Sequence, residues 1–318
     1  MAQLIMTVEE MKDRDAWLKL RNTGLGGSDA GIIVGVNPWR SRLALWAEKT
    51  GQAEPEDLSA NERIYWGAKL EDMVAEWFCE KTGKRVRRRG MMRSCEYPWM
   101  LASLDREVVG EKAGLEIKTT GAEQWRNWED DNIPDTYYCQ VQWYMAVTGF
   151  DRWYIAVLIG GNRAIWKEVA RNQAQIDMLI REGGRFWELV ENRVPPEPDG
   201  SDSAARALEA QYSHTVPDPI RLDNLQEVYD RMMAMDRAEK AAKASKEEAK
   251  QLIMARMGEH ELAQIGEHKV TWKVQAGRVT LDSKGLKKDH PDIYDQYKKV
   301  GNPTRVFRVY RGNLQWPM

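Results

Sequence analysis

Charged residues interrupt two neighbouring apolar stretches, and this pattern constrains the fold more than any other feature of the chain. Residues 101–121 read LASLDREVVGEKAGLEIKTTG, with Asp105 ending one apolar run and Glu116 and Lys118 inside the next. Both runs have the character of β-strands, and the two glycines between them favour a hairpin turn. We therefore expect an antiparallel strand pair that brings Asp105 beside Glu116 and Lys118.

These side chains suit metal-assisted hydrolysis. Residues two apart in a strand face the same side, so Glu116 and Lys118 project together while Ile117 packs on the other face. Two converging carboxylates form an oxygen-rich site suited to Mg²⁺ or Mn²⁺. A cation that lowers the pKa of bound water, with an ammonium group to position it, is what phosphodiester hydrolysis requires. The alternative is a cross-strand ion pair without catalytic function, worth about 0.2–1 kcal/mol on a surface.

Two polar residues on expected helices could complete this site. Glu71 lies in YWGAKLEDMVAEWF, within an amphipathic helix expected over 59–82, where its carboxylate could join the metal ligands. Gln140 lies in an aromatic and apolar helix expected over 136–148, from which its amide could hydrogen-bond the lysine, the water or a phosphate. The alternatives are a solvated glutamate and a hydrogen-bonded core amide.

The positions of histidine and cysteine narrow the possible chemistry. All four histidines lie beyond residue 210, so a site in the first 200 residues uses none. This disfavours Ser-His-Asp triads, Cys-His nucleophiles and His-ligated zinc. The three cysteines are too few and too scattered for a disulfide framework. No apolar run approaches the ~20 residues that span a bilayer, and the N-terminus lacks a signal-peptide pattern, so we expect a cytoplasmic protein without membrane contact.

Any attraction to nucleic acid must come from local patches, because the formal net charge is only −2. One such patch lies within residues 81–93, and its basic residues are Lys81, Lys84, Arg85, Arg87, Arg88, Arg89 and Arg93. The candidates for contacts with a DNA backbone are Arg85, Arg87, Arg88 and Arg89. A solvated charged face is the alternative.

Composition and periodicity predict an α/β core followed by an extension. Helical and strand-like segments alternate as far as residue 191, and VPPEPDGSDS at 194–203 marks a break in composition. Beyond it we expect a long helix over 224–257, followed by strands in HKVTWKV, RVTLD and RVFRVY. We therefore divide the chain into a core (1–195), a linker (196–220) and an α+β extension (221–318).

Five motifs resemble those of the PD-(D/E)XK nuclease superfamily and, within it, the YqaJ-like viral recombinase family, which is similar to phage lambda exonuclease. The order and spacing of the motifs match the family over roughly residues 12–195. The resemblance implies a restriction-endonuclease-like core in which helices flank a central mixed sheet. The motifs are W-x-x-L-R with GGSDA (17–30), WGAKLED (66–72), ASLDREV (102–108), LEIKT (115–119) and YYCQVQWYMAVTG (137–149).

The resemblance also implies residue roles. The implied catalytic set is Asp105, Glu116, Lys118, Glu71 and Gln140, and the implied metal ligands are Asp105, Glu116, Glu71 and the backbone carbonyl of Ile117. The implied cofactor is Mg²⁺, with Mn²⁺ as a substitute. Arg21 and Ser28 would hold the 5′-phosphate of a DNA end, a role that suits a guanidinium group beside a glycine-rich turn. One departure is Leu104, which stands where the superfamily has a proline.

The expected function is that of a metal-dependent exodeoxyribonuclease. It would degrade one strand of linear double-stranded DNA in the 5′ to 3′ direction and leave 3′ overhangs for recombination by strand annealing. By resemblance the partners would be DNA ends and a single-strand annealing protein of the RecT or Redβ type, and the assembly a homotrimer. The alternatives are a structure-specific endonuclease on the same core and a non-catalytic DNA-binding recombination scaffold.

Overall fold

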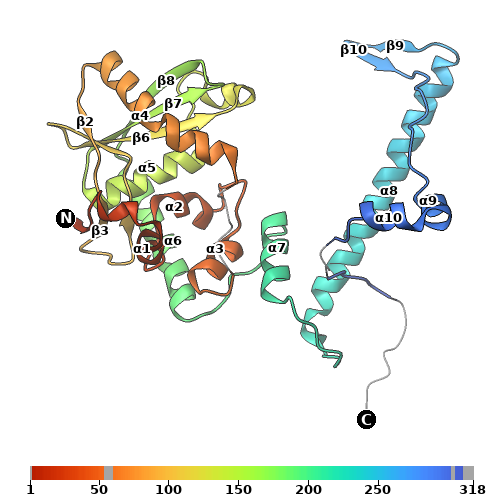
Figure 1. The fold of residues 1–318 in the computed structure, drawn as a ribbon, viewed down its shortest axis with the longest axis horizontal. Coiled ribbons are helices and arrows are strands. Elements are labelled where there is room, and N and C mark those ends of the chain that lie inside the picture. Colours follow the sequence, from red (N-terminus) through yellow and green to blue (C-terminus); the bar gives the residue numbers. More distant parts are fainter. Residues whose placement is uncertain (1, 54–59, 302–304, 311–318) are drawn as a thin grey trace. The chain divides into compact units, whose positions relative to one another are not determined.

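A five-stranded mixed sheet forms the centre of the first of two units into which the chain divides, Met1–His214 and Thr215–Met318 (Figure 1). The structure is a computed structural model and describes residues 2–53, 60–301 and 305–310. The sheet has the order β2-β5-β6-β7-β8. Its strands are β2 (Val86–Arg87), β5 (Arg106–Val108), β6 (Ala113–Thr120), β7 (Arg152–Ile159) and β8 (Arg163–Ala170).

One parallel pair makes this sheet mixed. Strands β6 and β7 run parallel, whereas β2–β5, β5–β6 and β7–β8 are antiparallel. A parallel pair needs a crossover connection, which here contains a short 3₁₀ segment (Ala122–Trp128) and helix α5 (Asp135–Thr148). The expected fold class, a central mixed sheet flanked by helices with a C-terminal extension, is confirmed.

Alternation along β7 separates two apolar layers. Trp153 and Ile155 belong to the core cluster on the α5 side, whereas Tyr154 and Ala156 pack with helix α4 (Glu62–Thr82). Successive strand residues point to opposite faces, so β7, which is apolar from Trp153 to Ile159, supplies both layers. Helices α4 and α5 therefore cover opposite faces of the sheet (Figure 1).

Further helices build the α5 layer. They are α2 (Gly27–Ile33), α3 (Arg42–Lys49) and α6 (Gln173–Glu191). Large tryptophans fill this core, and Trp46, Trp143 and Trp153 are each at most 1% exposed. These three tryptophans therefore serve packing in this layer.

A second, three-stranded sheet corrects one expectation. The segment YPWMLASLDREVV (97–109), which contains the apolar run ending at Asp105, reads as one strand, but it splits between two sheets. Its first part is β4 (Leu101–Ala102), which pairs in the order β1-β3-β4 with β3 (Met91–Ser94) and β1 (Ala2–Met6). Its second part is β5 of the large sheet. Residues 103–105 join the two sheets, so Asp105 lies just outside the β5 ladder.

The N-terminal helical segment packs on the small sheet. It comprises a 3₁₀ turn (Glu10–Lys12) and helix α1 (Arg14–Arg21). Trp17 and Leu20 of α1 pack against the buried side chains of Met91 and Leu101. The C-terminal end of α1 leads through a glycine-rich turn into α2, which places Arg21 close to the start of that helix.

The segment expected to be a linker contains a packed helix. Helix α7 (Asp202–Gln211) buries Ala204 and Ala207 in the core of the first unit. The backbone N–H of Ser41 also donates a hydrogen bond to Ser203 Oγ at 3.0 Å. The first unit consequently extends to His214, beyond the boundary at 195 that composition suggested.

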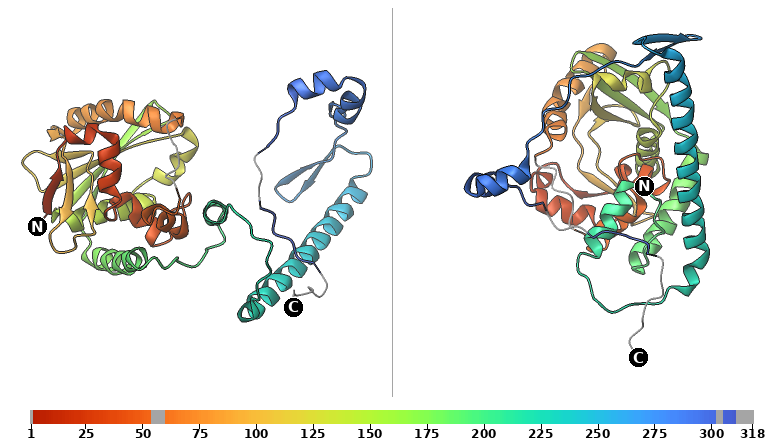
Figure 2. Two further views of the ribbon diagram at one scale, coloured as in Figure 1. Left: turned by 60° about the horizontal axis from the view of Figure 1, so that its bottom comes forward. Right: turned by 90° about the vertical axis from the view of Figure 1, so that its right-hand side faces the viewer.

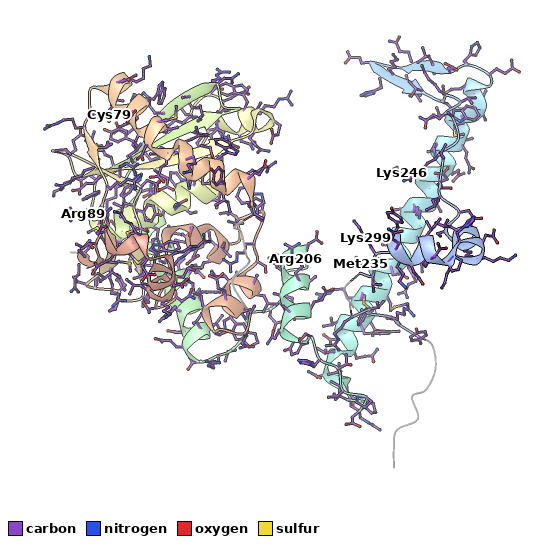
Figure 3. The ribbon with its side chains drawn as sticks, in the orientation of Figure 1. Cys79, Arg89, Arg206, Met235, Lys246 and Lys299 are labelled. Carbon is purple, nitrogen blue, oxygen red and sulfur yellow. The ribbon has the colours of Figure 1, made fainter. Side chains whose placement is uncertain are left out.

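The second unit is built around one long helix, α8 (Gln226–Met257), which Figure 2 shows without interruption. Side chains such as Met235 and Lys246 extend away from it along its length (Figure 3), and Met257 is its one buried residue. The other elements are a 3₁₀ turn (Asp223–Leu225), the hairpin strands β9 (Leu262–Ile265) and β10 (His268–Thr271), and the short helices α9 (Ser283–Asp289) and α10 (Pro291–Tyr297).

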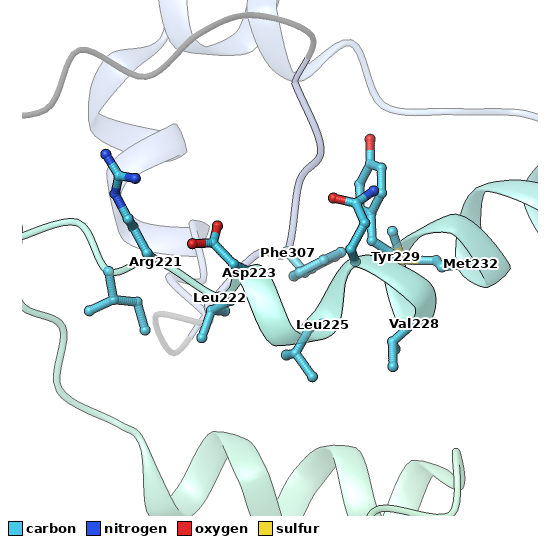
Figure 4. Close-up of a pocket in the computed structure, with 10 residues that line it drawn as sticks. Arg221, Leu222, Asp223, Leu225, Val228, Tyr229, Met232 and Phe307 are labelled. Carbon is cyan, nitrogen blue, oxygen red and sulfur yellow. The ribbon is translucent and has the colours of Figure 1, made fainter.

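The prediction of strands at 278–282 and 305–310 is wrong, because these residues form neither helix nor strand. Phe307 instead borders a cavity of about 570 Å³ with Leu225 and Tyr229 at the start of α8 (Figure 4). Within the described ranges, no helix is long and apolar enough to cross a membrane.

Candidate functional site

Strand β6 presents Glu116 and Lys118 towards helix α5. Ile117 between them packs on the opposite face with the α4 layer, as the strand period requires. Lys118 Nζ lies 2.6 Å from Glu116 Oε1 and 4.9 Å from the centre of the Tyr137 ring on α5. Glu116 is only 2% exposed, so this ion pair is shielded from water on most sides.

Asp105, which lies just before β5, approaches β6 from the β5 side. Strand β5 pairs with β6 through Arg106 and Glu107 only, and immediately before this ladder Asp105 Oδ2 accepts a hydrogen bond from the Ile117 N–H at 2.7 Å. The N–H and C=O of one strand residue point to the same side. The Ile117 carbonyl therefore also faces the Asp105 side, where the β5 ladder does not reach it. The sequence prediction that a hairpin joins Asp105 to Glu116 and Lys118 is confirmed in this geometry.

Helix α5 adds a glutamine to the carboxylates. Gln140 Nε2 donates to Glu116 Oε1 at 2.7 Å and to Tyr144 Oη at 3.0 Å. Glu116 Oε2, in contrast, is buried and has no hydrogen-bond partner within the part of the chain that the structure describes. An unpaired buried carboxylate oxygen is costly in free energy, so its presence indicates a site for a further positively charged or hydrogen-bonding group.

The electrostatics of the site also favour a cation. Burial raises the pKa of Asp105 well above its ordinary value, and the charges of Glu116 and Glu71 raise it further. Burial likewise raises the pKa of Glu116. Burial acts to lower the pKa of Lys118, but the carboxylates of Glu116 and Asp105 outweigh it, so this pKa is raised and the side chain stays an ammonium group. Two carboxylates, one of which has a buried oxygen without a partner among the described residues, suit a divalent cation.

Glu71 lies near these carboxylates but is engaged elsewhere. Its Oε1 is 2.5 Å from Nη1 of Arg106, a guanidinium group that is almost fully buried and also pairs with Asp72. Across residues 2–53, 60–301 and 305–310, no three His, Cys, Asp or Glu side chains are close enough to hold a metal ion together. The groups that fit a cation are thus the Asp105 and Glu116 carboxylates with the Ile117 carbonyl, and Glu71 would have to leave Arg106 to join them.

The two residues expected to hold a terminal phosphate are in contact. Arg21 Nη2, from the end of α1, donates to Ser28 Oγ on α2 at 2.9 Å. Ser28 is exposed, and the Arg21 side chain is 26% exposed, so both can be reached from solvent. A cleft of about 1090 Å³ lies in the same unit, bordered by Thr119 at the end of β6 and by Tyr137 on α5.

A buried ion pair that was not predicted supports Arg21. Asp29 lies 3.4 Å from Arg21 Nη2 and 3.2 Å from Lys49 Nζ, and it also accepts the Gly26 N–H at 2.9 Å. Burial acts to raise the pKa of Asp29, but Lys49 and Arg21 outweigh it and lower the pKa to about 2. Asp29 follows Ser28 in the GGSDA motif, which could have indicated its role, but no sequence signal indicated Lys49, because it approaches from a separate helix.

Acidic neighbours compensate most of the arginine-rich segment proposed to contact DNA. Glu107 pairs with Arg87 and with Arg89, which is labelled in Figure 3, at 3.2 and 2.8 Å. Asp72 pairs with Arg88 at 2.8 Å. Arg85 is exposed and has no ion pair with a described residue. Contacts between this segment and DNA stay a prediction.

The comparisons with known proteins identify the family. The family model described as the YqaJ-like viral recombinase domain matches residues 16–151. The uncharacterized protein YqaJ of Bacillus subtilis is 39% identical over 306 residues, which are 94% of each chain. The chain belongs to the YqaJ-like viral recombinase family. All the residues of the carboxylate site and the arginine–serine pair lie within the matched domain.

Solved structures similar to this YqaJ-like chain include two exonucleases. One is the alkaline exonuclease LHK-Exo from Laribacter hongkongensis, at 18% identity and a TM-score of 0.48, covering 56% of this chain and 93% of that one. The other is a phage-related exonuclease from Haemophilus somnus, at 13% identity and a TM-score of 0.44, covering 56% and 98%.

Proposed function

We propose that this YqaJ-like protein is a Mg²⁺-dependent exodeoxyribonuclease that degrades one strand of linear double-stranded DNA from its 5′ end. One observation carries the proposal: Asp105, Glu116 and Lys118 converge on the part of β6 that β5 does not cover, where Glu116 Oε2 is buried and has no hydrogen-bond partner among the described residues. A carboxylate pair beside an ammonium group is the set of charges that phosphodiester hydrolysis uses.

Each residue of the proposed site has a defined task. Asp105, Glu116 and the Ile117 carbonyl would hold Mg²⁺ or Mn²⁺, which when bound supplies a lowered water pKa and charge neutralisation. Lys118, kept protonated by the two carboxylates, donates hydrogen bonds to the attacking water or to a phosphate oxygen. Gln140 holds the Glu116 carboxylate through one of its amide hydrogens.

The proposed polarity rests on Arg21 and Ser28. A guanidinium group and a hydroxyl that face solvent together can bind a terminal phosphate. Arg21, Lys49 and Asp29 carry two positive charges and one negative charge, so this cluster holds a net positive charge that an anion would balance. Recognition of a 5′-phosphate would make digestion start at the 5′ end and leave 3′ overhangs.

The wider role follows from the family's description as viral recombinases. The 3′ overhangs would serve recombination by strand annealing, with a RecT or Redβ type protein as partner. A cytoplasmic homotrimer is the assembly that the family resemblance favours. Sedimentation of the full chain tests this part of the proposal, and a monomer would contradict it.

The decisive experiment follows linear duplex DNA labelled at one 5′ or one 3′ end, in Mg²⁺ and then in EDTA. We expect early release of the 5′ label as a nucleotide, later release of the 3′ label, and no reaction in EDTA. Closed circular plasmid should stay intact. Nicking or linearisation of the plasmid would instead indicate an endonuclease, and DNA binding without any hydrolysis would indicate a scaffold.

A further inference from the structure

Tyr144 lies between the carboxylate site and the arginine–serine pair. It is one turn beyond Gln140 on α5, and the Gln140 amide donates to both Glu116 Oε1 and Tyr144 Oη. A single amide nitrogen therefore separates the phenol oxygen from the catalytic carboxylate. Tyr144 itself is only 4% exposed, and its ring packs against Trp153.

The other side of the ring touches the segment that carries Ser28. A Cβ atom at Gly27 would lie 2.4 Å from Tyr144 Cε1 and 2.8 Å from Cζ, so the ring can approach only because residue 27 is glycine. Gly27 directly precedes Ser28, whose hydroxyl accepts the hydrogen bond from Arg21. The phenol thus contacts the backbone of one site and the glutamine of the other.

The phenol has a hydrogen-bond donor to spare. Its oxygen accepts from Gln140, and among the hydrogen bonds of the described residues its own O–H has no acceptor. Burial and then the charges of Glu116 and Asp105 raise the pKa of Tyr144 well above its ordinary value, so the proton stays on the oxygen. Buried hydroxyl donors rarely stay unpaired, and an acceptor from outside the chain would complete this one.

We propose that the Tyr144 hydroxyl donates a hydrogen bond to an oxygen of the 5′-terminal phosphate, the same phosphate that Arg21 and Ser28 would hold, on the side facing the carboxylates of Asp105 and Glu116. This inference rests on the proposed exonuclease function. The terminal phosphate and the first internal phosphate of a strand are one nucleotide apart. A rigid side chain that contacts both sites would fix this spacing and couple recognition of the end to cleavage.

The test compares Tyr144→Phe with Tyr138→Phe, the same substitution at a half-buried position of the same helix. Initial rates are measured on linear duplexes with a 5′-phosphate or a 5′-hydroxyl. We expect Tyr144→Phe to be about tenfold slower on phosphorylated ends, since a hydrogen bond to a charged group is lost, and within about twofold of wild type on hydroxyl ends. Tyr138→Phe should match wild type on both.

Equal losses on both kinds of end, or no loss on either, would overturn the role of Tyr144. A purely structural tyrosine would slow both reactions alike and lower the melting temperature, which circular dichroism measures. Equilibrium binding in EDTA supplies a readout without cleavage: Tyr144→Phe should lose preference for phosphorylated ends. If wild type prefers these ends and Tyr144→Phe does too, this inference fails while the exonuclease proposal stands. If wild type hydrolyses nothing in Mg²⁺, both fail.

Discussion

The carboxylate of Asp105 accepts a hydrogen bond from the backbone N–H of Ile117 at the point where β5 stops pairing with β6. The carboxylate takes the place of the backbone carbonyl that a β5 extended at its N-terminal end would offer to this N–H. Because the ladder ends here, β5 does not cover the Ile117 carbonyl or the neighbouring Glu116. A short β5 is therefore a condition for the proposed metal site.

Replacing Lys118 with Ala should slow hydrolysis by about 10²–10³-fold without abolishing DNA binding. The ammonium group is the one cation paired with Glu116 among the described residues, and loss of such a group from a phosphoryl site costs about 10²–10³ in rate. Single-turnover hydrolysis and fluorescence anisotropy measure the two properties. Lys246→Ala, at an exposed position of α8, is the control. Retention of full activity in Lys118→Ala would remove this lysine from the mechanism.

Mg²⁺ or Mn²⁺ should raise the melting temperature of the wild type and have little effect on Asp105→Asn. A ligand that binds only the folded state stabilises it, and stabilisation at a ligand concentration 100 times Kd is about 2.7 kcal/mol. Glu188→Gln, an exposed change on α6, should respond as the wild type does. Thermal denaturation over a metal titration provides the measurement. An equal response of Asp105→Asn would place the metal elsewhere.

In EDTA, Asp105→Asn should be more stable than the wild type at neutral pH. The folded-state pKa of Asp105 is raised, so its favourable contribution is complete below the ordinary value of 3.8 and is lost as pH rises towards the folded-state value. Removing the charge removes this loss. Urea unfolding between pH 4 and pH 8 should show a gap between the two proteins that widens with pH. A gap that is constant with pH would contradict the assignment.

Asp29 should show the opposite pH dependence. Its pKa falls from 3.8 unfolded to about 2 folded, so its contribution is complete above pH 4 and is lost as pH falls towards 2. This shift corresponds to about 2 kcal/mol at neutral pH. Asp29→Asn should cost more, about 3–5 kcal/mol, because it leaves the Lys49 ammonium buried without its carboxylate.

The double variant Asp29→Asn with Lys49→Met should recover part of that loss, since both buried charges are then absent. Chemical denaturation of the two single variants and the double variant measures the coupling. Additive losses would show that the pair does not interact in the way its 3.2 Å separation indicates.

Arg21→Gln should lose discrimination between phosphorylated and hydroxyl 5′ ends. The guanidinium group supplies a charge-assisted hydrogen bond, so we expect the rate on phosphorylated ends to fall by about 10–100-fold. Arg181→Gln, an exposed arginine on α6, is the matched control. An unchanged preference for 5′-phosphate would assign end recognition to other residues.

Local patterns were enough to predict most elements and the central triad of side chains. The period of two along β6 determines that Glu116 and Lys118 share a face, and the short hairpin determines that Asp105 is adjacent. The helices expected over 59–82 and 136–148 correspond to α4 and α5, which end at Gly83 and Gly149 in the left-handed conformation. These relationships depend on residues close in the chain, so they can be read without knowing the fold.

Only the tertiary structure decided which charges meet. Arg106 turns towards Glu71, Lys49 reaches Asp29 from another helix, and Gln140 connects Glu116 to Tyr144. The strands expected near 280 and 305 failed for the related reason that a strand needs a partner for its backbone groups, and sequence alternation alone cannot supply one. Pairings between distant segments depend on how whole layers pack. The local sequence around a residue therefore does not predict which distant residue it will contact across the core.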